Sequence, residues 1–263
     1  MRVFWKTVRD NRRGWIGWTL AVTAVASMYA SFWTSIGKNP EMAKAMETYP
    51  ESLKEALHLQ NLNQPESYLA SSVFGLLVPM LVAVFAVSAG VKAIASDEEA
   101  GTLDLVLAHP VSRVSLALQR FGAIAAVLAV MGTVLCLAII GLRGPAEFPE
   151  VAPSKIMAIC LQLALFGLFF AALSYAAGAW TGKRIAAIGT GAAVVVLGYL
   201  ADSFLPQIEG FGWTESISPF DWYLGGEPLR NGVQPGHAAL LLGLAVLLAA
   251  AGTWRFNRRD VTV

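Results

Sequence analysis

The chain has 263 residues, of which 56% are apolar and only 14% are charged. An ordinary soluble domain carries about a quarter charged residues, so this composition excludes a disordered chain and argues against a water-soluble globule. Nineteen Lys and Arg residues balance 18 Asp and Glu residues, which leaves no basic surplus for binding nucleic acid. Both cysteines lie inside apolar runs, so the sequence offers no disulfide framework and no zinc spacing. We therefore expect an all-α integral membrane protein.

Six stretches are long and apolar enough to cross a bilayer, which takes about 20 residues of helix. The third carries Arg120 near its start, and the fifth is the weakest because its uncharged run ends at Asp202. We expect one transmembrane domain over residues 1–263, with a large Gly-, Pro- and aromatic-rich connection at 206–235. The predicted spans are residues 14–36, 69–91, 116–142, 156–180, 185–205 and 236–254.

The distribution of Lys and Arg predicts the orientation, because cytoplasmic segments carry an excess of these residues. If the N-terminus is cytoplasmic, 13 of the 19 basic residues fall in inner segments. Six spans then return the C-terminus to the cytoplasm, together with Arg255, Arg258 and Arg259. We expect a multi-pass protein of the bacterial inner membrane with both termini cytoplasmic.

Residues 1–13 carry Arg2, Lys6, Arg9 and Arg13 at helical spacing, with apolar and aromatic side chains off that face. This pattern is typical of a helix that lies on the inner membrane surface. An ordinary basic flank that only sets the topology explains it equally well.

The inner segment between the second and third spans has a different pattern. Ser96 followed by Glu99 resembles a capping box, and acidic residues suit the start of a helix. Ala100, Leu103 and Leu107 fall on one helical face, and Pro110 ends the pattern. We therefore predict a short amphipathic cytoplasmic helix over residues 97–109, of the kind that docks in a groove on a partner.

Residues 98–113 read Glu-Glu-Ala-Gly-Thr-Leu-Asp-Leu-Val-Leu-Ala-His-Pro-Val-Ser-Arg. This segment resembles the ABC-2 type permeases of ATP-binding-cassette exporters, whose pattern is an acidic pair, Gly-Thr-Leu, an acidic residue, a Leu-rich turn, then Pro and a basic residue. The six spans and the basic C-terminal end extend the likeness over the whole chain.

The resemblance implies that residues 97–107 form a coupling helix on a separate nucleotide-binding ATPase. It also implies two ATPase subunits and a second permease subunit, identical or homologous, surrounded by membrane lipid. The residues expected at the ATPase interface are Asp97, Glu98, Glu99, Gly101, Thr102, Leu103, Leu107 and Arg113.

The chain itself offers no nucleotide site. The nearest approach to a phosphate-binding loop, residues 178–184, is one residue short and has Arg184 where a hydroxyl would bind Mg²⁺. No catalytic or metal-ligand cluster emerges either. We expect a non-catalytic permease without a cofactor, with ATP and Mg²⁺ bound by the partner.

Three small residues of the fourth span, Ser174, Gly178 and Gly182, are spaced by four, which lets helices approach closely. They predict packing within the subunit or, less favoured, a subunit interface. Gly189 and Gly191 of the fifth span are candidates to face them.

Pro79 lies mid-way along the second span and predicts a kink, which serves either gating or static packing. Gln162 and Asp202 are the candidate polar groups of a substrate pathway, since polar residues inside spans are often functional. The mostly apolar spans favour an amphipathic, lipid-like or drug-like substrate. The alternative is a secondary transporter or channel that works without ATP.

Overall fold

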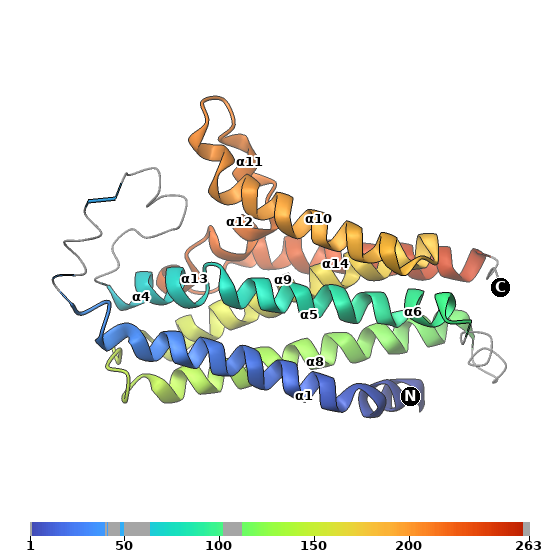
Figure 1. Cartoon of the computed structure of the whole chain (residues 1–263), viewed down its shortest axis with the longest axis horizontal. Helices are drawn as coiled ribbons and strands as arrows, with labels where there is room; N and C mark the ends of the chain where they lie inside the picture. The colour runs from blue at the N-terminus through green and yellow to red at the C-terminus, as the bar shows by residue number, and fades with distance from the viewer. Residues whose placement is uncertain (1, 40, 42–47, 50–63, 102–111, 260–263) are drawn as a thin grey trace.

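The computed structural model describes residues 2–39, 41, 48–49, 64–101 and 112–259 (Figure 1). Six helical segments in this part of the chain are long and apolar enough to cross a membrane, and the described residues contain no strand. All six predicted spans, and the all-α class, are thus confirmed. Their helices are α1 (Arg2–Ser31), α5 (Leu77–Ala93), α8 (Arg113–Leu142), α9 (Pro153–Thr181), α10 (Arg184–Ser203) and α14 (Pro235–Arg258).

Helix α9 forms the centre of the bundle and contacts α5, α8, α10 and α14. About 67% of its most apolar stretch is buried, against 22% for α1 and α10. Small residues make this close packing possible, as expected for helices in lipid. A Cβ atom on Gly90 of α5 would overlap the Ala171 carbonyl oxygen, and one on Gly252 of α14 would lie 2.9 Å from the Ala176 Cα.

Both termini lie at one end of the bundle, which we call the terminal end, next to the short helix α6 (Ala95–Glu99) (Figure 1). At the opposite end, the loop end, the described residues form four short helices. These are α4 (Pro65–Tyr68), α11 (Trp213–Ser216), α12 (Pro219–Leu224) and α13 (Pro228–Asn231).

Residues 2–13 correct one expectation. They are not a separate surface helix, because α1 runs without interruption from Arg2 to Ser31. No proline interrupts the helix where the basic segment meets the apolar one, at residues 13 and 14. A glycine such as Gly14 destabilises a helix by only about 1 kcal/mol relative to alanine. The Phe4 backbone N–H donates to the Gln119 side chain of α8 at 3.2 Å, which satisfies one of the free donors at the helix start. The basic segment therefore extends the first span and docks on α8.

The second span is interrupted one turn before Pro79. A π-helical segment at Leu69–Val73 is followed by a turn, and α5 then begins at Leu77. Pro79 lies in the first turn of α5, where its missing N–H costs little. The carbonyl of Phe74 accepts a buried hydrogen bond of 3.1 Å from the Tyr223 hydroxyl of α12. The sequence predicts a kink here, and the structure has an interruption one turn before Pro79 that is hydrogen-bonded to the distant helix α12.

The connection at 206–235 closes the loop end of the bundle. Phe220 and Tyr223 of α12 are 2% and 1% exposed, and both rings pack against Phe166 of α9 with centroids 5.0 and 5.2 Å away. The aromatic residues of this connection therefore anchor it in the core, a role that their sequence pattern leaves undecided.

Candidate functional site

The acidic residues Asp97, Glu98 and Glu99 form the acidic turn, which lies in α6 and follows α5 directly at the terminal end. The helix begins at Ala95, so Ser96 is not its cap; the Ser96 hydroxyl instead points back to the Val91 carbonyl at 3.5 Å. Because α6 ends at Glu99 and Gly101 adopts a left-handed φ of 65°, the predicted helix over 97–109 is not continuous. The left-handed backbone conformation at Gly101 is one that favours glycine, because glycine has no Cβ atom to clash. Thr102, Leu103 and Leu107 lie outside the described residues.

Asp97 binds the third span. Its Oδ2 accepts a hydrogen bond of 2.6 Å from Arg120 of α8, and the same guanidinium donates to the Ala93 carbonyl at 2.7 Å. The Arg120 side chain is only 12% exposed. A cation at the last carbonyls of α5 also complements the helix dipole. Arg120 thus ties the end of α5 and the start of α6 to α8.

Glu98 binds the C-terminal end of the sixth span. Its carboxylate forms an ion pair with Arg259, and the hydrogen bond to Oε1 is 2.6 Å. The Glu98 side chain is 4% exposed and that of Arg259 14%. Arg113, the first residue of α8, donates to the Arg259 carbonyl at 2.6 Å. This pair therefore joins α6, α8 and the end of α14 in one buried network.

Gly182 makes room for this pair. It ends α9 with a left-handed φ of 68°, and a Cβ atom there would lie 2.6 Å from Glu98 Oε1. The residues 178–184 therefore end a helix rather than form a phosphate-binding loop, which follows a strand. Gly182 is favoured by its backbone conformation, and the absence of a side chain leaves the space in which the ends of the Glu98 and Arg259 side chains lie.

Glu99 is exposed, and its Oε2 accepts a hydrogen bond of 3.0 Å from the backbone N–H of Arg184, the first residue of α10. A carboxylate at this position favours the start of that helix. The three residues of the acidic turn thus bind α8, α14 and α10 respectively. Sequence reasoning missed Arg120, Arg184 and Arg259 as their partners.

The small-residue stripe of α9 packs within the subunit. Ser174 and Gly178 are buried, and a Cβ atom on Gly191 of α10 would overlap the Ser174 hydroxyl. One on Gly189 would meet nothing within 4 Å. The favoured interpretation of this stripe is therefore supported by Gly191, whereas Gly189 does not face it.

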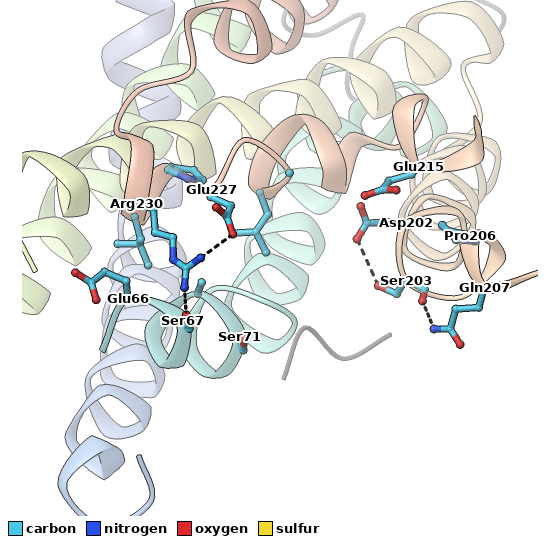
Figure 2. Close-up of a pocket in the computed structure, with 15 residues that line it drawn as sticks. Glu66, Ser67, Ser71, Asp202, Ser203, Pro206, Gln207, Glu215, Glu227 and Arg230 are labelled. Carbon is cyan, nitrogen blue, oxygen red and sulfur yellow. Dashed lines mark hydrogen bonds and ion pairs between the residues drawn. The ribbon is translucent and has the colours of Figure 1, made fainter. Parts of the chain in front are cut away.

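Asp202 lines a cavity of about 420 Å³ at the loop end. Among the residues that the structure describes, four carboxylates, those of Glu66, Asp202, Glu215 and Glu227, share this cavity with one cation, Arg230. Figure 2 shows the carboxylates of Asp202 and Glu215 next to each other, and Arg230 bonded to Ser67 and Glu227.

Asp221 lies close to this cavity on α12. Burial raises the pKa of its carboxyl to about 6, and the charges of Asp202 and Glu215 act in the same direction while His237 opposes them. The loop end therefore holds a strongly acidic group of side chains, of which Asp202 is the member that the sequence predicts.

Gln162, the other predicted pathway residue, is fully buried in α9. Neither its amide nitrogen nor its amide oxygen has a hydrogen-bond partner within the described part of the chain. It lines neither this cavity nor a second cavity, which lies at the terminal end of the bundle. The structure therefore does not bring Gln162 and Asp202 together.

A family model described as ABC-2 family transporter protein matches residues 1–261, almost the whole chain. The chain belongs to this family. It is a multi-pass membrane protein and an ABC transporter permease, and permeases of this kind are generally non-catalytic membrane subunits. No curated protein matches the permease. Within the described residues no group of His, Cys, Asp and Glu side chains is arranged to hold a metal ion.

Proposed function

We propose that the permease forms the substrate pathway of an exporter driven by ATP hydrolysis on separate nucleotide-binding subunits. The complete transporter contains two such ATPases and a second permease subunit, identical or homologous. ATP and Mg²⁺ bind to the ATPases. The observation that carries this proposal is the acidic turn, whose three side chains are each bonded to a different helix of the bundle.

The proposed orientation places the terminal end in the cytoplasm of a bacterial cell, with both termini inside. The positive-inside rule supports it, because Lys92, Arg113 and Arg120 join the basic N- and C-terminal ends there. The acidic turn and the following residues then face the compartment that holds ATP.

The contacts of the acidic turn suggest how movement of the ATPases reaches the membrane. The ATPase docks on the segment after Ala100, where the motif continues with Gly101, Thr102 and Leu103. A displacement of that segment acts on α5 through the chain itself. It acts on α8, α14 and α10 through Asp97, Glu98 and Glu99. The exposed Glu99 also presents a charge to the partner, whereas the buried Glu98 acts within the permease.

The substrate of this exporter is an amphipathic molecule of the lipid or drug kind. The apolar spans support this class, and the carboxylates around the loop-end cavity suit a positively charged group on such a molecule.

The decisive experiment is purification of tagged permease from its native membrane, followed by reconstitution of the complex and measurement of Mg-ATP hydrolysis. We expect a phosphate-loop ATPase to co-purify. Charge reversal of Glu98 and Glu99 is expected to abolish coupled ATP hydrolysis and export while membrane insertion persists. Glu209→Lys, which reverses an exposed carboxylate in the 206–235 connection, serves as the matched control.

Two outcomes contradict the proposal. One is that no ATPase accompanies the permease. The other is that the permease alone transports substrate when supplied only with an ion gradient, as a secondary transporter does.

A further inference from the structure

A second cavity of about 420 Å³ opens at the terminal end of the bundle. Its walls come from α1, α5, α6, α8 and the first residue of α10. The residues that decide its chemistry are Lys6, Trp15, Lys92, Asp97, Arg120 and Arg184.

The lining carries more positive than negative charge. Four cationic side chains, those of Lys6, Lys92, Arg120 and Arg184, face the carboxylates of Asp10 and Asp97. The pair between Arg120 and Asp97 neutralises one charge of each sign. Neither Lys6 nor Lys92 forms an ion pair with any residue that the structure describes. Both ammonium groups are therefore available to an anion.

The lining of the cavity also includes apolar residues. Trp15 is 9% exposed, and the lining residues Leu116, Ile124 and Ala89 are buried. Lys6 and Trp15 are nine residues apart on the same helix, which is ~13 Å along its axis. The cavity therefore runs from cationic side chains at the bundle end toward an apolar region. A small soluble anion needs only the first part, whereas a molecule with a charged head and an apolar continuation uses both.

We infer that this cavity binds the phosphate-bearing headgroup of an anionic phospholipid. Lys6 and Lys92 contact the phosphate, and Trp15 lies where the headgroup meets the acyl chains, as tryptophan commonly does. Basic pockets between transmembrane helices on the cytoplasmic side are suited to such headgroups. Because α1, α5, α6 and α8 all line the cavity, a bound lipid holds the acidic turn against the first three spans. This inference does not depend on the identity of the ATPase.

The test measures equilibrium binding of a fluorescent phosphatidylglycerol to the purified full-length permease in neutral detergent. Unlabelled phosphatidylglycerol, phosphatidylcholine and glycerol phosphate serve as competitors. We expect phosphatidylglycerol to compete at least tenfold better than the other two. The Lys6→Gln/Lys92→Gln variant is expected to bind about 25-fold more weakly, at roughly fivefold per lysine. Lys6→Arg/Lys92→Arg retains the charge and the affinity.

The matched control is Arg9→Gln/Arg12→Gln, which removes two exposed charges from the same part of α1 without touching the cavity. We expect its affinity to change less than twofold. If the control variant loses as much affinity for phosphatidylglycerol as the double lysine variant, the inference is overturned. The lipid is then attracted by the whole basic end of the bundle and not by this cavity. Equal competition by glycerol phosphate also overturns it, since it indicates a site for a free anion. Lys6 and Lys92 are exposed, so the variants are expected to fold, and size-exclusion chromatography checks this.

Discussion

Glu98 and Arg259, which lie 161 residues apart in the chain, form an ion pair whose side chains are 4% and 14% exposed. Such a pair is costly to form, because both charges leave water, and costly to break, because one charge then stays buried alone. We therefore infer that this ion pair serves to fix the end of α14 to the acidic turn. This relationship makes Glu98 an internal residue of the coupling region, in contrast to the exposed Glu99.

We predict that Glu98→Arg destabilises the permease by about 3–5 kcal/mol, since it leaves Arg259 facing a second cation. The exchange variant Glu98→Arg/Arg259→Glu is expected to regain more than half of this loss. Thermal unfolding of the purified permease in detergent measures both. Glu99→Arg is the control and is expected to cost less than ~1 kcal/mol, because Glu99 is exposed. If Glu98→Arg unfolds at the temperature of the unmodified permease, the pair does not hold α14.

A second prediction concerns the contact between α9 and α10. Gly191→Val is expected to destabilise by about 1–3 kcal/mol, because its side chain overlaps Ser174 and Val87 in a packed interface. Gly189→Val, two residues earlier on the same helix, meets open space in the subunit and is expected to be nearly neutral. Thermal unfolding of the two variants side by side checks this. A larger loss for Gly189→Val would place the important contact of α10 outside the subunit.

The interruption of the second span gives a third prediction. Tyr223→Phe removes the donor to the Phe74 carbonyl and leaves that buried oxygen without its bond, which costs about 1–3 kcal/mol. The exposed Tyr49 provides the control as Tyr49→Phe, with no expected effect. Guanidinium or thermal unfolding in detergent measures the difference. Equal stability of the two variants would mean that water replaces the Tyr223 hydroxyl.

The spans were predictable because each contains a long, mostly apolar run, with a charge only near the start of the third and the end of the fifth. Their ends were less so: the second span begins at Pro65 and the fourth at Pro153, where polar residues conceal the helix. Continuity of α1 was left open, because a basic segment followed by an apolar one is typical both of a surface helix and of a flank of the first span. The structure decides for the second interpretation, and the Phe4 backbone N–H bonds to Gln119 of α8.

The coupling region was only half predictable. Its acidic residues belong to a contiguous motif, so the sequence identifies them. Their partners lie on other helices, as far away as Arg259, and nothing in the local pattern selects one arginine over another. The one available signal was the basic C-terminal end, which sequence reasoning used for the topology and for the family resemblance but not to find a partner of Glu98. Gly182 was singled out for its spacing, whereas in the structure it ends α9 in a left-handed conformation and lies against the ends of the Glu98 and Arg259 side chains.

The raised pKa of Asp221 predicts how stability changes with pH. Its folded-state pKa is about 6 against an ordinary value of 3.8, so the folded permease binds this proton more tightly than the unfolded chain. The stabilisation is complete below about pH 4 and is lost as the pH rises to 6. At pH 7 the folded state therefore carries the cost of a partly buried, ionised carboxylate close to Asp202 and Glu215.

We accordingly expect Asp221→Asn to raise the stability of the permease at pH 7 by about 1 kcal/mol, a value reduced for solvent screening. The gain is expected to shrink toward pH 4, because the carboxyl of the unmodified permease is then protonated. Thermal unfolding between pH 4 and 8 measures this, with Glu209→Gln as the control that removes an exposed carboxylate from the same connection. A gain for Asp221→Asn that is constant over this range would show that packing, rather than titration of Asp221, causes it.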